Sequence, residues 1–89
     1  MLEPFYKKKF EKDLKRVSKR GKDITKLKAV IIDLIHENSL NKKLLDHPLK
    51  GDYADCRECH IEPDWLLIYL IEKNHITFIR TGTHADLFG

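Results

Sequence analysis

The run of seven apolar residues from Trp65 to Ile71 is the feature that most constrains how this chain folds. The run is rich in residues that favour β-structure, and it lacks the polar alternation of a strand with one face in water. It therefore predicts a central strand that is covered on both faces. It is also far too short to span a bilayer, so we expect no membrane partner.

Turn signals on either side of this run predict two flanking strands. The Glu62-Pro63-Asp64 segment is typical of a turn, since proline presets φ and aspartate favours turn positions, and Cys56–Ile61 would be the strand before it. Lys73-Asn74 is typical of a hairpin turn, and His75–Arg80 would be the returning strand. The second half of the chain is therefore predicted to form three antiparallel strands.

The first third of the chain has helical periodicity instead. Tyr6, Phe10, Leu14 and Val17 recur at steps of four and three residues, which predicts one apolar stripe along a helix. Gly21 is well suited to end this helix, because glycine readily adopts the left-handed conformation that follows a helix C-terminus.

A second helix is predicted to begin after Asp23, which is a favourable N-cap residue. The apolar residues within Ile24–Ile35 give this helix a wide apolar face, and Asn38 and Ser39 stop it. Residues 40–52 are predicted to form a loop.

The predicted order of elements is β-α-α-β-β-β, with a short first strand at residues 2–5 and one turn of helix in the tail from Thr81. A chain of 89 residues has room for one domain, spanning residues 1–89. Helices grouped before strands indicate an α+β fold, in which two N-terminal helices pack on a small, mainly antiparallel sheet.

The net charge of +3 hides an asymmetry along the chain. Residues 1–28 hold 11 of the 17 basic and 4 of the 14 acidic residues, a balance of +7, which leaves −4 for residues 29–89. A basic first third suggests a polyanion partner such as nucleic acid, and the alternative is a solvated helix face rich in lysine. The basic residues that lie off the apolar stripe are Lys8, Lys12, Lys15, Arg16 and Lys19.

The segment Cys56-Arg57-Glu58-Cys59-His60 has the C-x-x-C-H spacing of covalent haem attachment. The only methionine is Met1, so no methionine is well placed as a second axial ligand. On a strand, Cys56 and Cys59 would point to opposite faces, which also weakens a zinc site. We therefore expect structural thiols, no metal and no cofactor.

Two cysteines and a basic N-terminal segment without a secretory signal favour a cytoplasmic protein.

Three of the five histidines, His47, His60 and His84, fall at the ends of predicted strands or loops. Asp64 and Arg80 have similar positions. Since the ends of neighbouring strands meet at one rim of a sheet, these side chains could together form an active site. For any single histidine, a structural or surface role is the common alternative.

Cleavage of RNA by its own 2′-hydroxyl would use such a set. It needs a base, an acid and a fixed cation that meets the charge growing on the phosphorus. Histidine can serve as base or acid near neutral pH, and the arginine fork of Arg80 matches a phosphate. Phe88 or Trp65 could stack on a splayed base, although a place in the core is the common alternative for Trp65.

Half of the chain closely resembles YafQ-type toxins of the RelE/ParE superfamily, which belong to bacterial type II toxin–antitoxin systems. The resemblance combines charged, aromatic, glycine and proline positions that core packing alone would not dictate. It is carried by three ordered blocks, Asp46–Gly51, Glu58–Tyr69 and Arg80–Phe88. Residues 1–45 match only in pattern.

The resemblance implies a RelE-like fold and an endoribonuclease that enters the ribosomal A site and cleaves translated mRNA. It implies no metal, products with a cyclic phosphate and a 5′-hydroxyl, and inhibition by an acidic cognate antitoxin. In this interpretation His84 and His60 lead the acid–base chemistry with help from Asp64 and His47, Arg80 grips the scissile phosphate, and Phe88 orients a base, with Trp65 beside them.

Two alternatives from other functional classes stay open at this stage. One is a non-catalytic basic module that binds RNA or protein and whose histidines are structural. The other is a toxin that acts on gyrase, as ParE toxins of the same superfamily do. The ParE branch lacks such a set of histidines, so the three histidines of this chain favour the nuclease branch.

Overall fold

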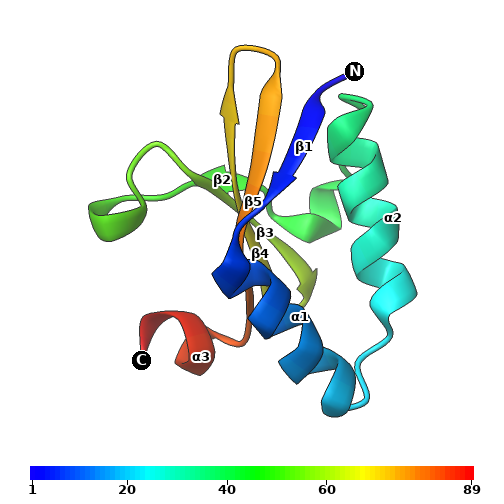
Figure 1. The fold of residues 1–89 in the computed structure, drawn as a ribbon, viewed down its shortest axis with the longest axis vertical. Coiled ribbons are helices and arrows are strands. Elements are labelled where there is room, and N and C mark those ends of the chain that lie inside the picture. Colours follow the sequence, from blue (N-terminus) through cyan, green and yellow to red (C-terminus); the bar gives the residue numbers. More distant parts are fainter.

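The computed structural model describes all residues from 1 to 89 and consists of one mixed sheet with helices on both sides (Figure 1). The strand order is β1-β5-β4-β3-β2, with β1 parallel to β5 and all other pairs antiparallel. The elements are β1 (Glu3–Tyr6), α1 (Lys8–Lys19), α2 (Ile24–Ile35), β2 (His47–Pro48), β3 (Arg57–Glu62), β4 (Trp65–Glu72), β5 (His75–Gly82) and α3 (His84–Phe88), with short 3-10 turns at Lys42–Leu44 and Gly51–Tyr53.

The α+β fold expected from the sequence is confirmed, including the three antiparallel strands and the hairpin turn at Lys73-Asn74. Two details differ. Tyr6 lies in β1 and is half-exposed, so it does not belong to the apolar stripe of the first helix. The segment 40–52, expected to be a loop, contains the first 3-10 turn, the whole of the short edge strand β2 and the start of the second 3-10 turn. No helix has the length and hydrophobicity needed to cross a membrane.

The ends of α1 and α2 follow the expected local chemistry. At the end of α1, Gly21 has φ +84°, and the amides of Gly21 and Lys22 donate to the carbonyls of Ser18 and Val17 at 3.1 and 3.2 Å. This is the double hydrogen bond of a glycine-terminated helix. At the start of α2, Asp23 accepts from the Thr25 amide at 3.0 Å, which confirms it as the N-cap.

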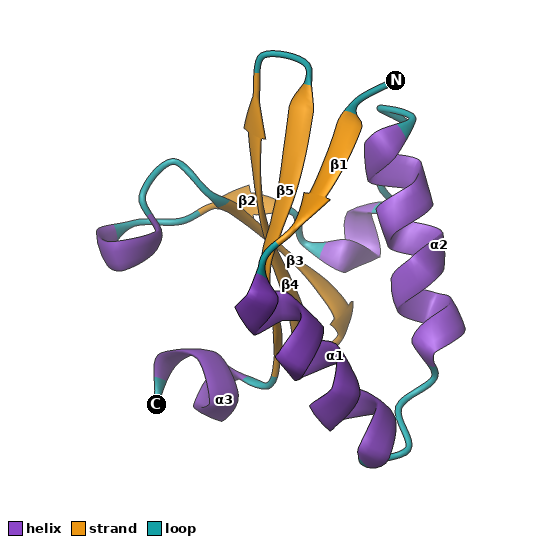
Figure 2. Ribbon diagram, in the orientation of Figure 1, coloured by secondary structure: helices purple, strands orange, loops and turns teal.

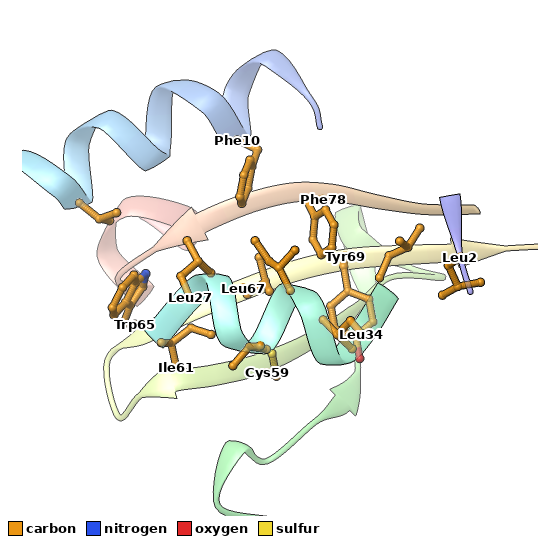
Figure 3. Packing of buried hydrophobic residues seen from close by; sticks show 14 residues of the cluster. Leu2, Phe10, Leu27, Leu34, Cys59, Ile61, Trp65, Leu67, Tyr69 and Phe78 are labelled. Carbon is orange, nitrogen blue, oxygen red and sulfur yellow. The ribbon is translucent and has the colours of Figure 1, made fainter. Parts of the chain in front are cut away.

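The sheet has a different apolar cluster on each face, which is why β4 is buried on both. The larger cluster lies under α1 and α2 and is built around Phe10, Leu27, Leu67, Tyr69 and Phe78 (Figure 3). The smaller cluster lies on the other face, where α3 and the second 3-10 turn cover it (Figure 2), and its buried members are Cys56, Leu66, Ile68 and Leu87.

Helix α3 is short, and its contacts fix it at the end of β5. The Thr83 hydroxyl accepts from the Asp86 amide at 3.1 Å, and the Asp86 carboxylate accepts from the Thr83 amide at 3.0 Å, so the two residues cap the helix reciprocally. Arg20 donates to both Asp86 oxygens at 2.6 and 3.0 Å, which ties α3 to the end of α1 and holds the pKa of Asp86 well below its ordinary value.

Replacing Gly82 with alanine will destabilise the protein because this residue has φ +154° and little space around it. An added Cβ would lie 2.9 Å from Asp86 Oδ2 and 3.0 Å from Asp86 Cβ. We expect the free energy of unfolding to fall by about 2 kcal/mol or more. Urea denaturation measures this loss.

The matched control is Gly51→Ala, which has φ +69° but an added Cβ that meets nothing within 4 Å. Backbone strain alone should cost this variant about 1 kcal/mol. Equal losses in the two variants would show that contact with Asp86 does not limit the space at Gly82.

Candidate functional site

A row of side chains crosses four strands on the face of the sheet that carries the smaller cluster. His47 lies opposite Glu58, Glu58 opposite Ile68, and Ile68 opposite Arg80. Residues directly opposite one another on neighbouring strands share a face, and Ile68 belongs to the smaller cluster. His47, Glu58 and Arg80 therefore lie on the face turned away from α2.

The three histidines of the sequence prediction come together beside this row. The ring centres of His47 and His60 are 6.0 Å apart, and those of His60 and His84 are 5.9 Å apart. Phe88 continues the line, with its ring centre 6.4 Å from that of His84 and 5.9 Å from that of Tyr53. Residues from β2, β3 and α3 thus form one continuous line of imidazole and aromatic rings.

Asp64 orients His84. Its Oδ1 accepts from the His84 backbone amide at 2.9 Å and lies 2.6 Å from His84 Nδ1. These two contacts lower the pKa of Asp64, which stays ionised and can only accept a hydrogen bond. The proton on His84 therefore lies on Nδ1, which leaves Nε2 free to take or give a proton.

Glu58 lies between the other two histidines. Its Oε2 is 3.0 Å from His47 Nε2 and 3.7 Å from His60 Nε2, and the side chain is almost fully buried. His47 Nδ1 is 2.6 Å from the Leu45 carbonyl, which only accepts, so this nitrogen carries a proton. With Nδ1 holding its proton, His47 turns Nε2 toward the Glu58 carboxylate, and an imidazolium at this position would pair with it.

The same three side chains could hold a metal ion. One ligand atom from each of His47, Glu58 and His60 lies within 4.8 Å of the other two. Imidazole and carboxylate are ligands for zinc, and imidazole also suits copper. The sequence pointed to possible metal ligands only around the cysteines. This group could not be predicted, because the pairing of β2 with β3 that brings His47 to Glu58 is not visible in the residue spacing.

The two cysteines confirm their expected structural role. Cys56 packs in the smaller cluster and Cys59 in the larger one, so they lie on opposite faces of the sheet. Both are free thiols. Burial raises the pKa of Cys59 to about 12, so it stays protonated and is a poor nucleophile and metal ligand.

Arg80 is held by a residue that sequence reasoning missed. Asp13 of α1 accepts from Arg80 Nε at 2.6 Å and from Nη2 at 3.1 Å, and this contact raises the pKa of Arg80. Asp13 is 2% exposed. A charged residue in a lysine-rich helix is normally expected to face water. The signal for burial of Asp13 was its position three residues after Phe10, which places both side chains on the same face of the helix.

The prediction that Trp65 contacts a substrate is wrong. Its side chain is 1% exposed, it packs in the larger cluster, and its indole nitrogen donates to Thr81 Oγ1 at 3.0 Å. Phe88, in contrast, is 49% exposed. Of the two candidate aromatic residues, only Phe88 is available to stack on a base.

The basic residues of α1 are all exposed, as the stripe predicted. Arg16 lies 3.7 Å from both Asp13 and Asp86, so acidic neighbours offset part of its charge. The basic residues of α1 without an acidic partner within 4 Å are Lys8, Lys9, Lys12, Lys15 and Lys19.

The protein is a small α+β domain whose histidines converge beside an ionised aspartate and a fixed arginine. This combination defines a class of proteins equipped for acid–base chemistry on an anionic substrate. Residues 2–89 match the family described as "Bacterial toxin of type II toxin-antitoxin system, YafQ". The chain belongs to this family.

Sequence and structure relatives agree with this assignment. The chain is 45% identical to the mRNA interferase toxin YafQ of Escherichia coli over 94% of this chain and 92% of that protein. The crystal structure of YafQ from Escherichia coli superposes with a TM-score of 0.95 at 41% identity, covering 100% of both chains.

Two further solved structures bear on partners and metals. YafQ in the Escherichia coli DinJ–YafQ complex has a TM-score of 0.93 at 42% identity, with 100% of both chains covered. A metal-bound toxin from Helicobacter pylori has a TM-score of 0.92 at 46% identity, covering 99% of this chain and 100% of that one.

Proposed function

We propose that this protein is an mRNA interferase, an endoribonuclease toxin whose single domain cleaves translated mRNA in the ribosomal A site by attack of the RNA's own 2′-hydroxyl. The observation that carries the proposal is the convergence of His47, His60 and His84 on one face, with Asp64 fixing the tautomer of His84. Family membership and the name of the Escherichia coli relative support it.

His84 and His60 form the acid–base pair. The rings are adjacent, and His84 presents Nε2 because Asp64 occupies its other nitrogen. When Nε2 takes a proton, the Asp64 carboxylate stabilises the imidazolium that forms. His47 and Glu58 assist this pair by holding a proton next to His60. After His60 has given its own proton to the leaving 5′-oxygen, this second proton can replace it.

Arg80 and Phe88 bind the RNA on either side of this pair. The guanidinium is a permanent charge and meets the negative charge that grows on the phosphorus in the transition state. Phe88 packs edge-on against Tyr53 and keeps about half of its surface exposed, which suits stacking on a splayed base.

A cognate acidic antitoxin is the proposed inhibitor. The related Escherichia coli toxin forms a complex with the antitoxin DinJ. The exposed lysines of α1 attract ribosomal RNA and an acidic protein alike, so the antitoxin would compete with the ribosome for this face. Such a toxin acts in the cytoplasm, where translated messages are found.

Replacing His84 with alanine will abolish mRNA cleavage with little loss of folding stability, because its side chain is 54% exposed and packs little apolar surface. A general acid or base contributes about 10²–10⁴-fold to the rate. The measurement is message cleavage in a cell-free translation reaction, with thermal denaturation in parallel.

His36→Ala is the matched control, since His36 is exposed at the C-terminus of α2, outside the line of rings. It should cleave at the wild-type rate. Wild-type cleavage by the His84 variant would exclude His84 as acid or base, and intact message with the wild-type protein would favour a non-catalytic binding module.

Cleavage will survive removal of metal ions. We propose that His47 and His60 act as proton carriers, and a metal bound with Glu58 would occupy the nitrogens that face this carboxylate. Toxin stripped with EDTA, freed of chelator and added to untreated ribosomes should keep its full rate, and added Zn²⁺ should lower it. If stripping abolishes cleavage and stoichiometric Zn²⁺ restores it, the chemistry depends on metal.

Neutralising three lysines of α1 will weaken ribosome binding without changing which sites are cut, since phosphate contacts position a protein but read no sequence. The variant changes Lys8, Lys12 and Lys15 to glutamine. Each lost phosphate contact should reduce the slope of log K against log[salt] by about 0.7–0.9. Ribosome co-sedimentation across a salt series measures the slope.

The control removes three exposed lysines far from α1 in the sequence, Lys42, Lys43 and Lys73. It loses the same charge but should keep a slope closer to that of the wild type. If both triple variants have the same slope, the lysines of α1 are an ordinary solvated face.

A further inference from the structure

Asp13 occupies a position that packing alone does not explain. It lies between Phe10 and Val17 on the buried face of α1 and is 2% exposed. A buried carboxylate is costly unless it is paired and fully hydrogen-bonded, and an apolar residue often serves packing as well. The value of a carboxylate here therefore lies in what it holds.

The Asp13 carboxylate is fastened to β5 by main-chain and side-chain contacts. Its Oδ2 accepts from the Thr81 backbone amide at 3.1 Å and from Arg80 Nε at 2.6 Å, and its Oδ1 accepts from Arg80 Nη2 at 3.1 Å. β1 pairs with β5 only as far as Phe78, so Asp13 reaches a part of β5 that β1 leaves unpaired. The guanidinium is thus held in one plane by two parallel hydrogen bonds.

We propose that Asp13 is a positioning residue that holds Arg80 in the orientation needed for cleavage, a role that rests on the proposed function. Neither hydrogen bond to Asp13 uses Nη1. The second edge of the guanidinium, with Tyr53 beside it, can therefore face a phosphate on the side of the sheet that carries His47 and Glu58. The side chain of Arg80 is only 16% exposed, which leaves it little freedom to find this orientation unaided.

The paired charge also predicts which kinetic constant depends on Asp13. Before cleavage begins, the negative charge of the Asp13 carboxylate offsets much of the attraction between Arg80 and the phosphate of the bound RNA. A fixed guanidinium edge acts mainly on the charge that appears in the transition state. Loss of Asp13 should therefore lower the maximal rate of cleavage and leave the concentration for half-saturation nearly unchanged.

The test is single-turnover cleavage of message on programmed ribosomes by Asp13→Asn. The asparagine amide keeps one acceptor oxygen but turns an NH₂ group toward the guanidinium, which should displace Arg80 from its position. Displacement of Arg80 should lower the maximal rate of cleavage about 10- to 100-fold. Asp13→Leu fills the same buried space with an apolar side chain and keeps the assay available if the asparagine variant unfolds. Val17→Ala loosens the same helix face without touching Arg80 and should keep the wild-type rate.

A double-mutant cycle separates positioning from a general effect on folding. In the Arg80→Ala background, Asp13→Asn should change the residual rate less than twofold, because there is no guanidinium left to orient. An equal loss in both backgrounds, or a wild-type rate in the Asp13 variants, overturns the inference while the proposed function stands. A wild-type protein that leaves the message uncut overturns the proposed function and this inference with it.

Discussion

The burial of β4 on both faces is the constraint on which the rest of this structure depends. Its alternate side chains pack either under the two long helices or in the smaller cluster beneath α3. Since strand register is fixed wherever a face is buried, the neighbouring strands are fixed too. A shift of one residue in β3 or β5 would turn Glu58 and Arg80 toward the helices and dismantle the row that carries the chemistry.

Each reactive side chain on this face is held by a second group. Asp64 sets the tautomer of His84, Glu58 contacts both His47 and His60, and Asp13 fixes Arg80. Such fixed dipoles and charges need no reorganisation when charge develops in a reaction. The partners differ in burial: Asp13 and Glu58 are buried, whereas Asp64 is exposed and its charge is screened by water.

Much of the fold and part of the site could be predicted from sequence. Apolar periodicity and turn residues report local structure, so the helices, the hairpins and the convergence of His47, His60 and His84 were accessible. The roles of Glu58 and Asp13 were not, because they depend on partners 11 and 67 residues away in the chain. Trp65 was misassigned as a substrate contact because an aromatic residue next to a candidate site does not reveal which face of its strand it occupies.

In the proposed mechanism, the histidines activate the 2′-hydroxyl of the RNA as the nucleophile. The most direct test is a ribosome-bound message with one 2′-deoxynucleotide on the 5′ side of the cleaved bond, with the end groups of the unmodified message identified by mass spectrometry. We predict that the unmodified message yields a 2′,3′-cyclic phosphate and a 5′-hydroxyl, and that the deoxy message stays intact. A 3′-hydroxyl with a 5′-phosphate, or cleavage of the deoxy message at the same bond, would contradict the mechanism.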